Sequence, residues 1–350
     1  MEGKEKAMRI FIASYQTLML NRGGPSFKTM KMLEGLHKIG VEVKLFNMWD
    51  KDLELGENDL VHIFHGHIQT YPLARNLKTY GAKYVVNPIF YSNHSATTIK
   101  LYRALEAPFR KVFKRTYSDY FFTKYICDNS EMVLPNTQAE ADILNKALGV
   151  DTKKLKVIEN GVEKRFASAK SDLFKDKYGL EGFILYVGHL GAVRKNGVKI
   201  IKALGELGQP AVIIADVLKN KEGSRCLELI DKYNNITYLG WLNHDDPLLA
   251  SAYKACKVFA LPTRYETPGR AALEAGLAGA NIVITPHGGT KEYFADMAEY
   301  PDPHSISSIK KAVQKALHRK KNDRLKDHIL KNYIWDVIVR KNLEIYKKIL

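Results

Sequence analysis

The chain has 350 residues, of which 45% are hydrophobic, 26% charged and 10% aromatic, and its formal net charge is +16. This composition is typical of a globular protein and excludes a disordered, collagen-like or low-complexity chain. At roughly 150 residues per domain, the length predicts two domains. We find no apolar run close to the ~20 residues of a membrane-spanning helix, no apolar signal-peptide core, and only three widely spaced cysteines. These absences predict a cytoplasmic protein without a disulfide framework.

The positive charge is concentrated in two segments. Residues 99–125 contain seven Lys or Arg and two acidic residues, and residues 310–350 contain thirteen Lys or Arg and four acidic residues. Each segment predicts either a solvated face or an anionic partner.

Strand-like apolar runs alternate with helical patterns through the first half of the chain. Residues 8–13 form the first run, and apolar residues then follow at helical spacing from Phe27 to Ile39. Pro25 suits the first turn of this helix and Gly40 suits its end. Further strands are expected at 41–46, 60–64, 84–89, 132–135 and 155–158. This alternation predicts βαβ units and a parallel sheet.

A second series follows Asn160-Gly161-Val162. Its strands are expected at 183–187, 211–215, 236–239, 257–261 and 281–285. A helix is expected at 269–279 and an amphipathic helix at 333–350. The sequence therefore predicts an α/β protein with two doubly wound, Rossmann-like domains, 1–165 and 166–332. In such sheets ligands bind at the carboxyl ends of the strands.

Several familiar sites are not supported. No G-x-G-x-x-G motif follows a strand, and residues 188–197 lack the Gly-Lys-Ser/Thr ending of a P-loop. Asp50-Lys51-Asp52 has the spacing of a metal-binding pair of acids, but such pairs are common on loops, and no metal site is predicted. Alternation along a strand sends His62 to the face opposite His65 and His67, so a shared zinc ion is not expected.

The strongest functional pattern lies in 261–276. A buried strand ends there, a loop brings Glu266 to the crevice, and a helix begins near Gly269. The N–H groups at the start of that helix make an anion site, beside which Arg270 adds a cation. Glu274 lies about one turn further on. Carboxylates beside a phosphate site suit a ligand that also offers hydroxyl groups. The pattern predicts a nucleotide sugar, and its alternative is a pair of surface glutamates around a helix start.

These residues resemble the family 4 glycosyltransferases, which have the two-domain GT-B fold. Glu266 and Glu274 match the E-x7-E motif of that family. Other segments agree in order along the chain: Arg22-Gly23-Gly24-Pro25, Val157-Ile158-Glu159-Asn160-Gly161-Val162, Tyr186-Val187-Gly188-His189 with Lys195-Asn196-Gly197, and Thr285-Pro286-His287-Gly288-Gly289. The resemblance implies two domains that face each other across a cleft, with the helix at 333–350 crossing back onto the first.

The same resemblance implies a retaining, metal-independent glycosyltransferase. It would move a hexose-type sugar from a nucleoside diphosphate sugar to an acceptor hydroxyl, in the synthesis of cell-envelope glycolipid, polysaccharide or glycan. Glu266 would contact the donor sugar and Glu274 the ribose, while Lys195 would stabilise charge on the departing diphosphate. The implied donor-binding residues are Gly23, Gly24, Arg194, Lys195, Glu266, Thr267, Pro268, Gly269, Arg270 and Glu274. No cofactor is expected.

Two departures from the family pattern concern histidines. His189 stands where the family normally has arginine, so either Arg194 supplies the missing cation or the site is weaker. Residues 85–90 lack the family's histidine near the reacting carbon. His94 or His65 then either lines the reaction centre or is simple polar packing. The implied catalytic residues are Glu266, Lys195, His189, His94 and His65.

The first basic segment suggests how an acceptor is reached. Aromatic residues recur at helical spacing over 109–121, with Arg110, Lys111, Lys114 and Arg115 on the opposing side. This pattern is typical of an interfacial helix on an anionic membrane, and equally of a core helix with a solvated face. The expected acceptor is a carbohydrate or lipid-linked, with peripheral membrane binding through 99–125. Nucleic acid is not expected, because no binding motif is present.

Two other functions fit the same frame. One is a nucleotide-sugar epimerase or hydrolase, although the E-x7-E layout favours transfer. The other is a non-catalytic nucleotide-sugar-binding protein, for which His189 is the only indication. The sequence does not predict the donor sugar, the base, the acceptor or the oligomeric state.

Overall fold

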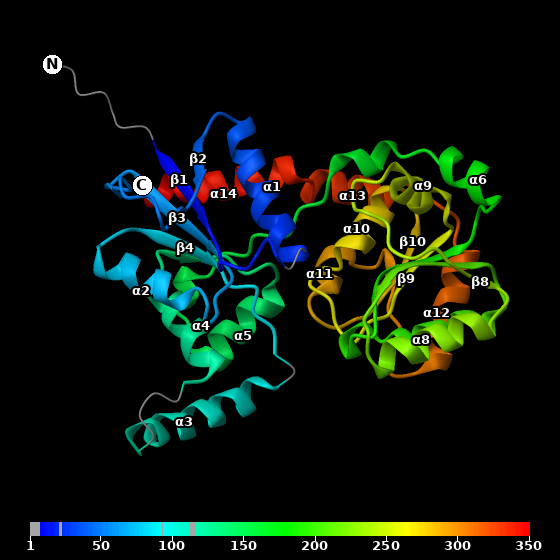
Figure 1. The fold of residues 1–350 in the computed structure, drawn as a ribbon, viewed down its shortest axis with the longest axis horizontal. Coiled ribbons are helices and arrows are strands. Elements are labelled where there is room, and N and C mark those ends of the chain that lie inside the picture. The colour runs from blue at the N-terminus through cyan, green and yellow to red at the C-terminus, as the bar shows by residue number, and fades with distance from the viewer. Residues whose placement is uncertain (1–7, 21–22, 93, 113–116) are drawn as a thin grey trace. The chain divides into compact units, whose positions relative to one another are not determined.

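Two parallel sheets organise the chain in the computed structural model (Figure 1), which describes residues 8–20, 23–92, 94–112 and 117–350. One unit consists of Met1–Gly161 with Trp335–Leu350, and the other of Val162–Ile334. The last helix therefore belongs to the first unit. The domain boundaries predicted from the sequence are at residues 165 and 332, and those in the structure follow Gly161 and Ile334. The α/β class with two parallel-sheet domains is confirmed.

The first unit has a five-stranded sheet in the order β2-β1-β3-β4-β5, and every pairing is parallel. Its strands are β1 (Arg9–Ala13), β2 (Glu42–Leu45), β3 (Asp59–Phe64), β4 (Tyr84–Asn87) and β5 (Met132–Val133). Its helices are α1 (Gly24–Lys38), α2 (Tyr71–Thr79), α3 (Ala96–Val112), α4 (Asp119–Asp128), α5 (Gln138–Leu148), the short 3-10 helix η1 (Thr152–Lys154) and α14 (Trp335–Ile349).

Both faces of the first sheet are covered, because its strands alternate between two apolar clusters. Ile10 and Ile12 of β1 pack in a cluster with residues of α1 and α14. Phe11 and Ala13 pack on the opposite face, with residues of α2, α4 and α5. The red helix α14 lies beside the blue α1 in Figure 1. This packing gives the amphipathic C-terminal helix the apolar surface that its pattern requires.

The second unit has a six-stranded sheet in the order β11-β10-β9-β6-β7-β8, around one apolar core. Its strands are β6 (Ile184–Leu190), β7 (Ala211–Val217), β8 (Ile236–Tyr238), β9 (Val258–Leu261), β10 (Asn281–Ile284) and β11 (Ala298–Glu299). Its helices are η2 (Lys164–Ser168), α6 (Asp172–Tyr178), η3 (Val193–Lys195), α7 (Gly197–Leu207), α8 (Lys221–Lys232), α9 (Pro247–Ala255), α10 (Arg270–Leu277), α11 (Thr290–Phe294), α12 (Ile306–His318) and α13 (Arg324–Asn332).

Three expectations about elements were wrong. The strand expected at 155–158 is reduced to an isolated bridge between Val133 and Leu155. The short strand β11 was not predicted. Residues 109–121 are not one helix, because α3 ends at Val112 and α4 begins at Asp119. Ser118 starts the new helix, since its Oγ accepts a hydrogen bond from the Phe121 backbone N–H. Phe113, Lys114 and Arg115 lie outside the described residues.

Candidate functional site

Two cations converge on Glu266 in the loop between β9 and α10. Glu266 is 7% exposed. Its Oε1 accepts hydrogen bonds from Lys195 Nζ at 2.6 Å and from Arg194 Nη1 at 3.1 Å. Backbone hydrogen bonds fix the loop, from Arg264 N–H to the Arg194 carbonyl at 2.9 Å and from Glu266 N–H to the His287 carbonyl at 3.1 Å. The short helix η3 and the loop therefore hold a carboxylate and two cations in one place.

Glu266 is ionised despite its burial. Burial alone would raise the pKa of this carboxyl. The charges of Lys195 and Arg194, with hydrogen bonds from Lys195 and Thr263, outweigh that effect and hold the pKa below its ordinary value. The cluster is thus a buried anion whose charge is balanced by two cations.

The helix α10 begins beside this cluster. Gly269 precedes it with φ +84°, and a Cβ there would lie 3.0 Å from Ile284 Cδ1, so glycine is required. The first N–H groups of a helix have no partner inside the helix, and they carry its positive dipole end. Thr267 Oγ1 donates to the Gly288 carbonyl at 3.0 Å, and the Thr267–Pro268 bond is cis. This geometry can accept an anion next to the two cations.

Glu274 is held by protein groups on both oxygens. Its Oε1 accepts a hydrogen bond from His244 Nε2 at 2.9 Å and forms an ion pair with Arg270 Nε at 3.2 Å, and its Oε2 accepts a hydrogen bond from Tyr253 Oη at 3.0 Å. Burial would raise its pKa, but the hydrogen bond from His244 and the charge of Arg270 hold it below the ordinary value. Only 2% of Glu274 is exposed. The structure therefore shows it as the centre of a buried network.

His189 lies at the end of β6 and stacks on Trp241. The centroids of the two rings are 5.1 Å apart, and the ring planes are inclined by 16°. Burial, and then the positive charge of Lys195, lower the pKa of His189 in spite of Asp216, whose Oδ2 is 3.8 Å from Nδ1. His189 is therefore neutral at neutral pH and does not replace a permanent cation. The second cation of the cluster is instead Arg194.

The remaining expected site residues belong to the first unit. Gly23 is the N-cap of α1, and a Cβ built on Gly24 meets no described atom within 4 Å. Nothing described inside the unit thus requires glycine at 24. His65 follows β3 with φ +78°, and its ring is 4.8 Å from that of His67. His94 is exposed, and its backbone N–H donates to Ser92 Oγ at 3.1 Å.

Within the described residues, one group of side chains has a metal-like arrangement: Glu163, His244 and Asp245. The guanidinium of Arg165 already lies among them, with Nε 3.2 Å from Glu163 and Nη2 3.7 Å from Asp245. A cation of the protein therefore balances this group.

The basic segment 99–125 is partly structural. Arg103 Nη1 donates to the Ala147 and Leu148 carbonyls at 3.1 and 2.8 Å, at the end of α5. Lys124 forms an ion pair with Asp128 at 2.7 Å. Tyr120 packs against Phe90 and Tyr102, with rings 6.1 and 5.9 Å apart.

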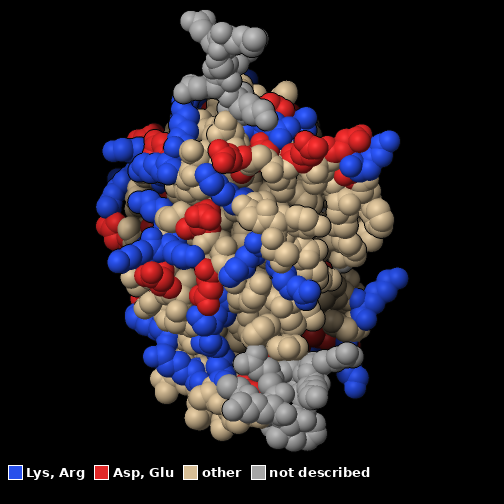
Figure 2. All heavy atoms as spheres, turned by 90° about the vertical axis from the view of Figure 1, so that its left-hand side faces the viewer, with Lys and Arg blue, Asp and Glu red and all other residues tan. Residues whose placement is uncertain are grey.

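On the first unit as a whole, Lys and Arg side chains gather along one side of the face shown in Figure 2, with acidic side chains among them. None of the helices in the described ranges is long and apolar enough to span a bilayer.

The second unit matches a known family. Residues 170–332 match the family described as Glycosyl transferases group 1. Most of the second unit is therefore similar to the group 1 glycosyl transferases, and the match covers just under half of the chain. The chain is 26% identical over 181 residues to mannosylfructose-phosphate synthase of Agrobacterium fabrum, a match that covers 45% of this chain and 38% of the synthase. It is 28% identical over 162 residues to the serotype-specific mannosyltransferase WbdA of Escherichia coli, covering 43% of this chain and 20% of WbdA. The matches thus span well under half of these two relatives.

Solved structures of glycosyltransferases share the fold of nearly the whole chain. Sucrose-phosphate synthase from Thermosynechococcus elongatus has a TM-score of 0.74 at 17% identity, covering 98% of this chain and 99% of that one. HepE from Anabaena, in complex with UDP and glucose, has a TM-score of 0.67 at 16% identity, covering 98% and 100%. At these identities the likeness concerns the fold, which is GT-B.

Sequence reasoning missed three side chains of the second unit: His244, Tyr253 and Trp241. Trp241 follows Gly240 at the carboxyl end of β8, a position where ligand-contacting residues gather in parallel sheets. Asp246 and Pro247 mark the start of α9 by their types, and that signal could have placed the loop that carries His244. No spacing relates His244 or Tyr253 to Glu274, however, since they lie 30 and 21 residues away.

Proposed function

We propose that this protein is a retaining glycosyltransferase that transfers a sugar from a nucleoside diphosphate sugar to an acceptor hydroxyl without a metal ion. The observation that carries the proposal is the buried cluster of Glu266, Lys195 and Arg194 beside the start of α10. A donor of this class has hydroxyl groups for a carboxylate and a diphosphate for cations and helix N–H groups. Few other ligands would use both parts of the cluster.

The charge of each donor-site residue determines which part of the donor it binds. Glu266 accepts hydrogen bonds from hydroxyls of the donor sugar. Lys195, Arg194 and the backbone at Gly269 and Arg270 bind the diphosphate and stabilise the negative charge that it gains as it leaves. The two cations are paired with Glu266. The arriving diphosphate therefore shares cations that are already oriented, which reduces the cost of ordering them.

The base is proposed to bind near His189 and Trp241, whose stacked rings offer a flat surface at the carboxyl ends of β6 and β8. Glu274 contributes by fixing His244 and Arg270, and it contacts the ribose. The UDP complex of HepE supports a uridine nucleotide. The mannosyl relatives support a hexose-type donor.

The acceptor side is assigned to the first unit. Gly23 and Gly24 are proposed to approach the diphosphate, because a glycine at 24 has no described packing reason. His65 and His94 are proposed to line the reaction centre. We propose a carbohydrate or lipid-linked acceptor of cell-envelope synthesis, with the enzyme on the cytoplasmic side of the membrane. A solved trehalose-6-phosphate synthase of the same fold, studied for glycosyl transfer with retention, supports the stereochemistry.

Thermal unfolding with a panel of UDP, GDP and ADP sugars tests donor binding. A ligand at 100 times its dissociation constant stabilises by about 2.7 kcal/mol, which raises the midpoint by roughly 5–10 °C. Glu266→Gln should lose the shift that the sugar moiety adds, and Lys195→Met should weaken the shift with the free nucleotide. Glu299→Gln is the matched control, because Glu299 is also buried and ion-paired, to Arg319 and Lys315 in the same unit. It should keep the full shift.

Product analysis tests the chemistry. With the donor that binds, proton NMR should show a product whose anomeric configuration is that of the donor, and added EDTA should leave the rate unchanged. A folded protein that shows no shift at millimolar donor would overturn the donor site. An inverted product, or a rate abolished by EDTA, would overturn the mechanism.

A further inference from the structure

The crossover between β2 and β3 contains no helix. The two strands lie on either side of β1, so their connection must cross one face of the sheet. Parallel strands are usually joined by a helix that covers the face it crosses. Residues 46–58, all of them described, instead form turns and extended chain. One stretch of the sheet face beside α2 therefore lacks the helix that would normally close it.

An apolar groove of about 800 Å³ lies at this place. The groove is part of the same face as the cluster around Phe11 and Val61. Its apolar lining comes from the crossover, from α2 and from the residues just before β4, namely Phe46, Leu53, Leu55, Leu73, Leu77 and Ala82. Along α2 the lining extends from Pro72 to Tyr80, so the groove is on the order of 12 Å long at about 1.5 Å per residue.

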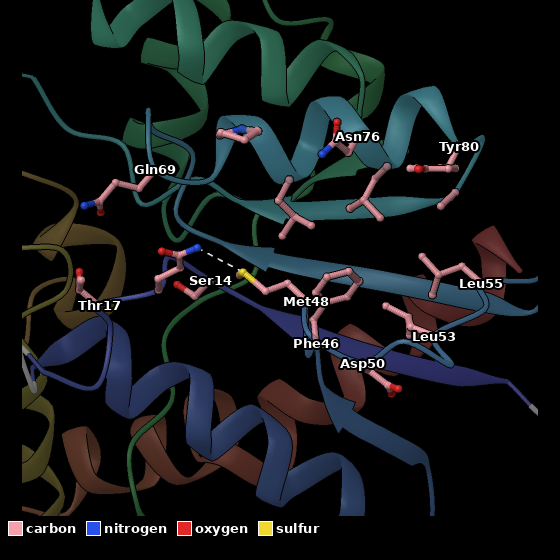
Figure 3. Close-up of a pocket in the computed structure, with 15 residues that line it drawn as sticks. Ser14, Thr17, Phe46, Met48, Asp50, Leu53, Leu55, Gln69, Asn76 and Tyr80 are labelled. Atoms are coloured by element: carbon pink, nitrogen blue, oxygen red, sulfur yellow. Dashed lines mark hydrogen bonds between the residues drawn. The ribbon is translucent and has the colours of Figure 1, made fainter.

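Polar side chains gather at one end of the groove, although Asp50, Asn76 and Tyr80 also line the rest of it. Figure 3 shows Ser14, Thr17 and Gln69 at one end and Leu55 and Tyr80 at the other. Ser14 directly follows β1, so the polar end lies at the carboxyl edge of the sheet, where ligands of such folds react. Leu55 and Tyr80 precede β3 and β4, at the amino edge. An elongated ligand would therefore present its polar end to the reaction edge.

Charge indicates what kind of polar end this is. Asp50 is the one charged side chain among the described lining residues, and no lysine or arginine lines the groove. The amide of Gln16 donates to Met48 Sδ at 3.2 Å, a weak acceptor that a hydroxyl can replace. Neutral amide and hydroxyl side chains suit a polyol, and the described lining residues offer an anionic head group no lysine or arginine as a partner.

Large apolar side chains are exposed on the loops that follow β1, β2 and β3. Met19, Leu20, Met48, Trp49 and Ile68 are 49, 82, 47, 86 and 53% exposed. Exposed apolar residues scattered singly are ordinary, whereas several on loops that meet at one edge mark a site for an apolar partner. They follow β1, β2 and β3, the three strands whose carboxyl ends border the groove.

We propose that this groove binds the hydrocarbon chain of an amphiphilic acceptor whose head is an uncharged sugar. This inference rests on the proposed function, because it names the class of acceptor for the same transfer. The chain lies on the sheet face between α2 and residues 46–58, and the sugar hydroxyls reach Ser14, Gln16, Thr17 and Gln69. The acceptor is thus recognised by its apolar part as well as by its sugar.

Calorimetry with alkyl glucosides below their micelle concentration tests the groove without turnover. Affinity should rise about fourfold for each added methylene from butyl to octyl glucoside, and methyl glucoside should bind weakly. Leu55→Asp places a charge in the groove, and Ala82→Leu fills it without one. Both should reduce octyl glucoside affinity at least tenfold. Leu227→Asp, at a residue 38% exposed on α8 of the second unit, is the matched control and should bind as the wild type.

The outcomes separate this inference from the proposed function. If the nucleotide sugar stabilises every variant equally while only the groove variants lose octyl glucoside, both stand. If no nucleotide sugar binds but the chain-length dependence remains, the proposed function fails and the amphiphile site survives. Affinity that is independent of chain length, or unchanged in both groove variants, overturns the inference. Preference for octyl phosphate or anionic vesicles over octyl glucoside overturns it as well.

Discussion

His65 is a side chain whose protonation differs between the folded and the unfolded protein. Burial, and then the charges of His67 and Lys28, lower its pKa to about 4. An unfolded histidine titrates near pH 6.5. The folded state therefore binds fewer protons between pH 6.5 and 4. The stability that follows from neutral His65 is complete above pH 6.5 and is lost as the pH falls toward 4.

This residue should make the free energy of unfolding depend on pH. Between pH 7 and pH 5, protonation linked to His65 alone should lower the free energy of unfolding of the wild type by about 2 kcal/mol. His65→Asn removes the titration and keeps a side chain that tolerates positive φ. Between pH 7 and pH 5, the free energy of unfolding of this variant, measured with urea, should fall by about 2 kcal/mol less than that of the wild type. The exposed His94→Asn serves as the control and should behave as the wild type. An equal loss in His65→Asn would show that His65 is not buried as neutral imidazole.

The residues that sequence could assign to the site are those that share one element or one recognised motif. Glu266, Gly269 and Glu274 lie on one strand–loop–helix segment, and motif resemblance added Lys195. The hydrogen-bond partners of Glu274, His244 and Tyr253, could not be assigned this way. Tyr253 reaches it because α9 packs on α10. Such packing depends on side-chain volumes across the whole unit, which no local spacing encodes.

At the scale of elements, Gly35 sets how closely α14 packs on α1. A Cβ at Gly35 would lie well inside van der Waals contact with Val339 of α14. Overpacking of this kind costs about 1–3 kcal/mol, which exceeds the gain of about 1 kcal/mol that alanine brings to a helix. Gly35→Ala should therefore lower the free energy of unfolding by up to about 2 kcal/mol, as measured by urea unfolding.

Gly24→Ala, on the same helix, is the matched control. Nothing described lies within 4 Å of its added Cβ, so it should be neutral or stabilising. Val339→Ala, introduced into Gly35→Ala, should recover part of the loss because it removes the clashing methyl groups. A Gly35→Ala protein as stable as Gly24→Ala would mean that α14 moves freely along α1.

Element prediction succeeded where the burial was uniform. The strands β3, β4, β9 and β10 are buried at every residue, so their apolar runs were visible in the sequence. Element prediction failed where a local hydrogen bond or a missing partner strand decided whether the element forms. The pattern at 109–121 is interrupted by the cap at Ser118, and residues 155–158 have the composition of a strand but only one bridging partner. Strand composition cannot supply a partner.

The molecule as a whole has separate apolar cores. One cluster lies within the second unit, and the two others cover the faces of the first sheet. Each core includes its own sheet and helices, so each unit has the buried surface that a domain needs to fold cooperatively. The C-terminal helix takes part in the first unit, although the second unit precedes it in the chain.

Calorimetry should therefore resolve two unfolding transitions that respond to different changes. Gly35→Ala should lower the transition of the first unit. Gly276→Ala should lower that of the second, because a Cβ there would lie 2.9 Å from Leu325 Cδ2 and 3.0 Å from Ile329 Cδ1. A nucleotide that binds the second unit should raise only the transition that Gly276→Ala lowers, by several degrees when the ligand is in hundredfold excess over its dissociation constant. A single transition that moves with either glycine and with the nucleotide would instead mean that the two units fold as one. In that case donor binding would also stabilise the acceptor side, because one cooperative transition couples the two.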